Sequence, residues 1–236
     1  MHNLANRIIL ITGASRGIGA AVALHLAKQG AHIITCARDV GKLEAVDDAI
    51  QEATGQPCTI MPLDLADHDK IDAIGPAIYE KFGRLDGFIG NAALLGQVTP
   101  LTHHDPTQFQ RVMDVNVTAN WRLLRILDPL LMRSDAGRVA FVTSGVTQTT
   151  IPYFGVYAAS KYALESIALH YAAERVDTSL KVNLIDPGIV CTDMRGQAFP
   201  SEDKSLLCPP DDLALMALFS NAMLPSCAQH ATRLSR

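Results

Sequence analysis

A serine, a tyrosine and a lysine in this chain are spaced for proton transfer. Lys161 follows Tyr157 by four residues, and residues four apart on a helix share one face. A phenol has a pKa of about 10, and a fixed cation beside it favours the phenolate and lowers that pKa. Ser144 supplies a hydroxyl that can hold a substrate oxygen. The three residues predict an acid/base site for a carbonyl/alcohol pair, although tyrosine and lysine at this spacing also occur on exposed helix faces.

A glycine-rich turn stands near the N-terminus, between an apolar run at residues 7–12 and a helical pattern at 20–28. Glycine permits positive φ and close backbone approach, and free amides at a helix start attract a pyrophosphate. Strand, turn and helix in this order predict a dinucleotide-binding site, whereas a glycine-rich turn alone often only connects two elements. The turn residues expected to contact the dinucleotide are Gly13, Ser15, Arg16, Gly17, Ile18 and Gly19.

Strand and helix patterns alternate along the rest of the chain. Strands are expected near residues 31–36, 58–63, 85–90, 138–143 and 180–185, and helices near 39–53, 67–82, 105–133, 155–177 and 210–223. This alternation predicts an α/β fold, a Rossmann-type doubly wound parallel sheet with helices on both faces. We expect residues 1–236 to form a single domain, because no linker or repeat interrupts the pattern. Ligands of such sheets bind beyond the C-terminal strand ends, where the glycine turn, Asn91 and Ser144 converge.

The order and spacing of these motifs resemble the short-chain dehydrogenase/reductase family. The matching motifs are residues 12–19, Asn91-Ala92, Asn116, Ser144, Tyr157 with Lys161, and Pro187-Gly188. The resemblance covers about residues 5–220. Within the family, the sequence particularly resembles bacterial members of unassigned substrate. It implies an NAD(P)-dependent oxidoreductase that moves a hydride between a nicotinamide and a small carbonyl or alcohol substrate, with carbonyl reduction favoured. The catalytic residues would be Asn116, Ser144, Tyr157 and Lys161, with Asn116 holding a water that links the lysine to solvent.

The resemblance also assigns coenzyme contacts outside the glycine turn. They are Asp64 and Leu65 near adenine, Asn91 and Ala92 at the central strand, Pro187, Gly188 and Thr192 along the nicotinamide, and Tyr157 and Lys161 at its ribose. One residue departs from the family pattern. Ala93 replaces the usual glycine, and its methyl group would crowd the adenosine ribose and weaken the affinity for the coenzyme.

The residues after the second predicted strand bear on the choice of coenzyme. Ala37 stands where NAD-dependent members carry a carboxylate, and Arg38 follows it. A guanidinium pairs with a 2′-phosphate through charge-assisted hydrogen bonds, and Arg16 is a second candidate cation. We therefore expect NADP(H) as the cofactor. NAD(H) stays open, because Asp39 could bind the ribose; Arg38 and Asp39 could also simply begin the next helix.

The composition narrows the classes of partner. A net charge of −4 without a basic run gives no electrostatic case for nucleic acid or an anionic membrane. No apolar stretch approaches the roughly 18 residues of a membrane span, and no signal peptide is evident, so a cytoplasmic location is expected. The cysteines and histidines lack ligand spacing, and we expect no metal. The alternative function is a non-catalytic NADP-binding regulator or scaffold on the same fold; a sugar-nucleotide epimerase or dehydratase is a weaker reading.

Two segments leave questions open at this stage. The loop 189–209 should select the substrate: Met194 and Phe199 suggest an apolar pocket, and Arg195 could meet an anion or face water. By resemblance, helices 105–133 and 155–177 would pair two subunits, so a homodimer is expected. Its candidate contacts are Trp121, Leu124, Leu127 and Leu131, which could equally be core. Residues 224–236 show no strand pattern, so we do not expect the extra strand that builds tetramers in the family.

Overall fold

The computed structural model describes residues 4–225 and 230–235, and its centre is a parallel sheet of seven strands. Their spatial order is β3-β2-β1-β4-β5-β6-β7. The strands are β1 (Ile8–Thr12), β2 (His32–Ala37), β3 (Thr59–Pro62), β4 (Gly87–Gly90), β5 (Arg138–Val142), β6 (Lys181–Asp186) and β7 (Thr232–Ser235). The predicted α/β doubly wound sheet is confirmed.

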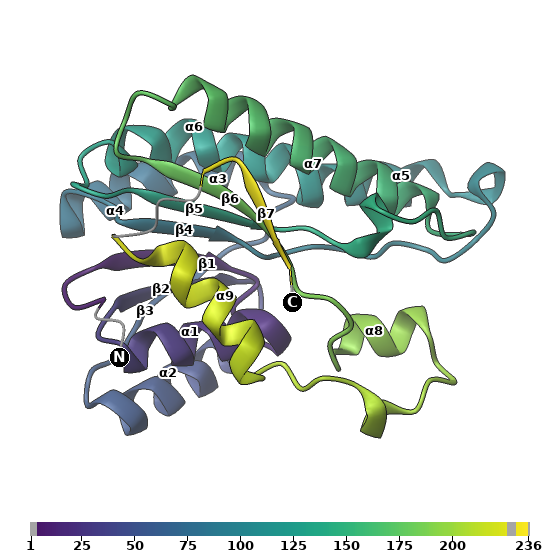
Figure 1. Ribbon diagram of the computed structural model, residues 1–236, viewed down its shortest axis with the longest axis horizontal. Coiled ribbons are helices and arrows are strands. Elements are labelled where there is room, and N and C mark those ends of the chain that lie inside the picture. The colour runs from purple at the N-terminus through teal and green to yellow at the C-terminus, as the bar shows by residue number, and fades with distance from the viewer. Residues whose placement is uncertain (1–3, 226–229, 236) are drawn as a thin grey trace.

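Helices cover both faces of the sheet (Figure 1). One layer holds α1 (Gly17–Lys28), α2 (Val40–Thr54) and α9 (Leu213–Met223). The other holds α3 (His68–Asp72), α4 (Ile74–Phe82), α5 (Pro106–Met113), α6 (Ala119–Leu131) and α7 (Gly155–Glu174). α8 (Asp193–Ala198) lies away from both layers, beyond the end of the sheet (Figure 1). Single 3-10 turns occur at Leu101–His103, Gly145–Thr147 and Lys204–Leu206.

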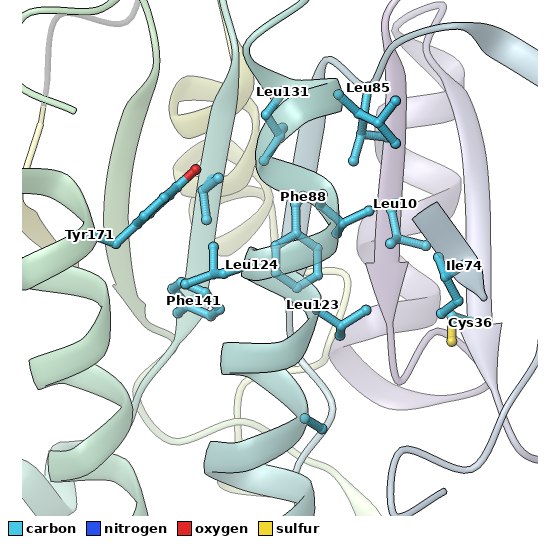
Figure 2. Close-up of a cluster of buried hydrophobic side chains, with 14 of the residues drawn as sticks. Leu10, Cys36, Ile74, Leu85, Phe88, Leu123, Leu124, Leu131, Phe141 and Tyr171 are labelled. Carbon is cyan, nitrogen blue, oxygen red and sulfur yellow. The ribbon is translucent and has the colours of Figure 1, made fainter. Parts of the chain in front are cut away.

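The strands are apolar on both sides because both faces are covered. In β1, Leu10 belongs to the core cluster under α4, α6 and α7, while Ile9 and Ile11 belong to the cluster under α1, α2 and α9. Figure 2 shows part of the first cluster, in which Phe88 and Phe141 meet edge to face with ring centroids 5.6 Å apart. These two cores hold the strand ends in fixed register, which a site assembled from several strands requires.

The chain crosses from one half of the sheet to the other between β3 and β4. β2 and β3 extend outward from one side of β1, and β4 returns to pair with its other side. The connections that leave β1 and β4 therefore run to opposite layers and leave a crevice between them. In open α/β sheets this reversal of strand order is where ligands bind.

Several elements differ from the sequence prediction. The segment expected as one helix at 105–133 is α5, a π-helical turn at Asp114–Thr118 and then α6; the wider turn carries the buried Asn116. The expected helix at 67–82 is divided into α3 and α4 at Ala73. The prediction of no strand in residues 224–236 was wrong for 232–235, which form β7 beside β6; residues 226–229 and 236 lie outside the described part.

Candidate active site

The glycine turn brings the backbone of β1 against the start of α1. Gly13 and Gly17 have φ of +66° and +55°, the left-handed region that glycine enters without strain. A Cβ at Gly19 would lie 2.3 Å from the carbonyl oxygen of Gly13, so only glycine fits there. The first turn of α1 carries no acidic residue, and among the described residues no side chain caps it. Its amides and the positive end of the helix are thus suited to bind the pyrophosphate of a dinucleotide.

Asn91 joins β4 to this turn. Its side-chain Nδ2 donates to the carbonyl oxygens of Thr12, at 2.9 Å, and Gly13, at 3.2 Å. The backbone amides of Asn91 and Ala92 donate in turn to the Thr12 hydroxyl, at 3.1 and 3.2 Å. The two strands on either side of the crevice are thereby tied together at their C-terminal ends.

Tyr157 and Lys161 lie in the first turns of α7, directly above the ends of β5 and β6. Both side chains are buried, and the Lys161 ammonium lies 5.7 Å from the centroid of the Tyr157 ring. Lys161 Nζ donates to the carbonyl oxygen of Val142, 2.8 Å away at the end of β5. Ser144 follows two residues later and caps the 3-10 turn that leads back to α7. The spacing of the three residues therefore brings them to one place.

The electrostatics of the pair differ from the prediction of a lowered phenol pKa. Burial raises the pKa of Tyr157 to about 12, opposed by a hydrogen bond with Ser144 and reinforced by the charge of Asp186. Burial also lowers the pKa of Lys161 to about 8, with Glu165 acting in the opposite direction. Because burial raises the pKa of Tyr157 more than its hydrogen bond with Ser144 lowers it, the phenol stays in its acid form at neutral pH.

Asn116 is fully buried, and its side chain is engaged with neighbouring structure. Oδ1 accepts from the backbone amide of Leu94 at 2.7 Å, and Nδ2 donates to the Leu94 carbonyl oxygen and to Ser160 Oγ, both at 2.9 Å. Asn116 thus fixes the loop after β4 against α7. Its predicted water-mediated link to Lys161 stays a prediction.

One cleft of about 1110 Å³ runs along the C-terminal ends of the strands. The predicted site residues that line it are Gly13, Ser15, Arg16, Gly17, Ile18, Arg38, Asp64, Leu65, Asn91, Ala92, Ser144, Tyr157, Lys161, Pro187, Gly188 and Thr192. Gly19 and Asn116 are not among the lining residues. Gly19 packs against the backbone of Gly13, and Asn116 is hydrogen-bonded to the backbone of Leu94. Ala93, the departure from the family pattern, also lines the cleft.

The two candidate cations for a 2′-phosphate differ in their surroundings. Arg16 forms an ion pair with Asp193 of α8, Nη1 to Oδ2 2.7 Å, so its charge already has a partner. Arg38 is exposed at the end of β2, and no carboxylate among the described residues pairs with it. Asp39 accepts a hydrogen bond from the amide of Lys42 and is the N-cap of α2. This agrees with the alternative in which Asp39 simply begins the helix. Arg38 is therefore the better candidate of the two arginines to bind a 2′-phosphate.

A cluster of charged side chains lies behind Ser144, and no pattern in the sequence predicted it. Arg233 of β7 donates through Nη1 to Glu165, at 2.6 Å, and to Thr147, at 2.7 Å. Its Nη2 donates to the Ser144 carbonyl oxygen at 3.0 Å and to Asp186 at 2.6 Å. Only Glu165 could have been anticipated, because it follows Lys161 by one helical turn.

The comparisons with known proteins agree with this geometry. The model of the short chain dehydrogenase family matches residues 7–203, most of the chain and all of the sheet except β7. The chain belongs to the short chain dehydrogenase family. An uncharacterized oxidoreductase of this kind, YciK of Escherichia coli K12, is 40% identical over 218 residues, covering 92% of this chain and 86% of its own.

Solved short chain dehydrogenases have the same fold. One from Escherichia coli CFT073, complexed with NADPH, is 39% identical with a TM-score of 0.94, covering 98% of this chain and 97% of its own. One from Shigella flexneri, complexed with NADP, is 38% identical with the same TM-score and the same coverage. In the described part of this family member, no helix is long and apolar enough to cross a membrane, and no group of three or more metal-ligating side chains gathers.

Proposed function

We propose that this short chain dehydrogenase reduces a carbonyl compound with NADPH. The observation that carries the proposal is that Tyr157, Ser144 and Lys161 line the same cleft as the glycine turn and Arg38. Hydride donor and proton donor must act on one substrate within a few ångströms, and a continuous cleft meets that requirement. The product would be the corresponding alcohol.

The residues present fit a dinucleotide phosphate. Gly13, Gly17 and the uncapped start of α1 would hold the pyrophosphate, and Arg38 would pair with a 2′-phosphate. The similar enzymes from Escherichia coli and Shigella flexneri are complexed with NADPH and NADP. Bound NADPH supplies the hydride. Every other step falls to side chains of this chain.

Tyr157 donates the proton to the substrate oxygen. Its pKa of about 12 keeps the phenol protonated near neutral pH, which is the form that carbonyl reduction needs. Ser144, hydrogen-bonded to the same phenol, holds the substrate oxygen in line. Lys161 is a cation below its pKa of about 8, and its charge stabilises the phenolate left after the proton has moved.

A homodimer is the proposed assembly, and of the four residues first considered only Trp121 suits its contact surface. Leu124, Leu127 and Leu131 are 5%, 0% and 0% exposed and belong to the core. Trp121 on α6 is 48% exposed, and Tyr162 on α7 is 53% exposed. Large exposed aromatic side chains on these helices favour burial in a protein interface. Light scattering should give twice the chain mass for the wild type and the monomer mass for Trp121→Asp.

The decisive experiment compares wild type with Tyr157→Phe. The change removes one hydroxyl and should lower turnover by roughly 10²–10⁴, while NADPH binding is retained. Turnover is followed by loss of NADPH absorbance against a panel of ketones and aldehydes. A wild type that binds NADPH but reduces none of the panel, or a Tyr157→Phe variant as fast as wild type, contradicts the proposed reaction.

A further inference from the structure

We propose that the substrate end of the cleft is a subsite for an uncharged aromatic ring, and that Phe154 and Phe199 determine this specificity. The inference rests on the proposed carbonyl reduction and names the class of its substrate: aryl ketones and aryl aldehydes. It follows from the side chains packed around Tyr157 and from the partner that Arg195 has taken.

The first observation is a pair of stacked rings beside the phenol. Phe154 precedes α7 by one residue and belongs to a small buried cluster with Leu95, Val146 and Tyr157. Phe199, at the end of α8, stacks on Phe154 with ring centroids 5.5 Å apart and an angle of 19° between planes. Both rings line the cleft. The part of the cleft that adjoins the proton donor is therefore lined by two aromatic side chains.

The second observation is that Arg195 is not available to a substrate anion. Its Nε and Nη2 donate to the two carboxylate oxygens of Glu202 at 2.6 and 2.5 Å. The guanidinium carbon lies 3.9 Å from the centroid of the Phe199 ring. This bidentate pair balances the charge of the Arg195 guanidinium, which packs against the Phe199 ring. Arg195 thus orients Phe199, which answers the question that the sequence left open.

Asp186 and Lys204 also line the cleft. Asp186 is paired with Arg233, and Lys204 is exposed to solvent. A substrate carboxylate placed against the two phenylalanines would lose its hydration, and Arg195, already paired with Glu202, would not replace it. An aromatic ring would instead gain offset or edge-to-face contacts, which favour it over a saturated ring by roughly 2- to 12-fold.

Binding measurements test the subsite without relying on turnover. Acetophenone, cyclohexyl methyl ketone and phenylglyoxylate share the reacting carbonyl, and NADP⁺ has no hydride to give. Ligand-observed NMR titrations, with and without NADP⁺, should show acetophenone binding roughly 2- to 12-fold tighter than the saturated ketone. Phenylglyoxylate should bind at least about tenfold more weakly than acetophenone. In Phe199→Leu the preference for the aromatic ketone should vanish. Equal affinities in the wild type would overturn the proposal.

A charge variant tests the role of Glu202. Glu202→Gln removes the partner of Arg195, so the preference for acetophenone over phenylglyoxylate should narrow about tenfold. Asp203→Asn is the matched control: Asp203 bonds Ser205 rather than an arginine, and the preference should stay at the wild-type value. An unchanged preference in Glu202→Gln would overturn the assigned role of the pair. If the binding pattern holds and no ketone is reduced with NADPH, the subsite stands and the proposed reaction fails.

Discussion

Arg233 Nη2 lies 2.6 Å from Asp186 Oδ2, a contact that links β7 to the residue at the end of β6. The same guanidinium holds Glu165 on α7 and the backbone oxygen of Ser144. Glu165 and Asp186 are 15% and 13% exposed, so neither carboxylate is well solvated. β7 therefore does more than extend the sheet: it supplies the cation that keeps two carboxylates beside the cleft neutralised.

Arg233→Met should destabilise the protein by about 3 kcal/mol, because it leaves two largely buried carboxylates without their cation. Urea unfolding followed by circular dichroism measures the change. Adding Glu165→Gln to Arg233→Met should restore part of the lost stability, since one of the unpaired charges is then removed. A double variant no more stable than Arg233→Met would contradict this account and point to lost packing instead.

Lys161→Met should stabilise the fold near pH 7 while abolishing turnover. The lysine pKa falls from 10.5 to about 8 in the folded protein, which corresponds to about 3 kcal/mol of lost stability at pH 7. The unfolded chain binds the extra proton between those two values, so the stability of the wild type rises as pH increases from 8 to 10.5. The difference in melting temperature between Lys161→Met and the wild type should therefore decrease from pH 7 to pH 10. A constant difference across this range would refute the buried charge as its cause.

Arg38→Glu should weaken NADPH binding by roughly 10- to 100-fold, because a charge-assisted hydrogen bond is lost and a carboxylate then faces the 2′-phosphate. NADH lacks that phosphate, so its affinity should hold or improve. Arg16→Gln is the comparison variant. Since Arg16 is already paired with Asp193, its loss should weaken NADPH binding by less than about threefold. Fluorescence titration of the wild type and both variants with NADPH and with NADH gives the six dissociation constants. A larger loss in Arg16→Gln would reverse the assignment of the two cations.

Gly19→Ala should abolish dinucleotide binding. The added methyl group would lie 2.3 Å from the Gly13 carbonyl oxygen and 2.6 Å from Asn91 Nδ2, both held by hydrogen bonds and strand pairing. α1 must then move away from the turn that holds the pyrophosphate. Gly41→Ala, where the nearest atom is 3.9 Å away on the exposed start of α2, should bind as the wild type does. Normal NADPH affinity in Gly19→Ala would show that the turn tolerates the shift.

The sequence predicts most of the fold because its information is local. Apolar runs followed by helical patterns give the strands β1 to β6 in order, and parallel strands bring their C-terminal ends to one edge, so Ser144, Asn91 and the glycine turn were expected to meet. β7 escaped prediction because Thr232–Ser235 is short and partly polar, and it becomes a strand only against β6. Its register there decides which atoms Arg233 can reach.

The properties that depend on burial could not be read from spacing. The spacing of four from Tyr157 to Lys161 predicted their proximity correctly, yet the direction of the shift in the phenol pKa depends on how much protein covers it. Likewise, Leu124 and Trp121 look alike as apolar positions of one helix, but one is core and the other exposed. The pairing of Arg195 with Glu202 depends on how the chain turns after α8, for which the sequence carried no clear pattern.

The position of Arg233 has a practical consequence for handling the enzyme. A purification tag fused after residue 236 would begin four residues beyond Arg233, whose guanidinium supports the loop of Ser144. Recombinant protein intended for kinetics should therefore carry its tag ahead of β1 rather than after β7.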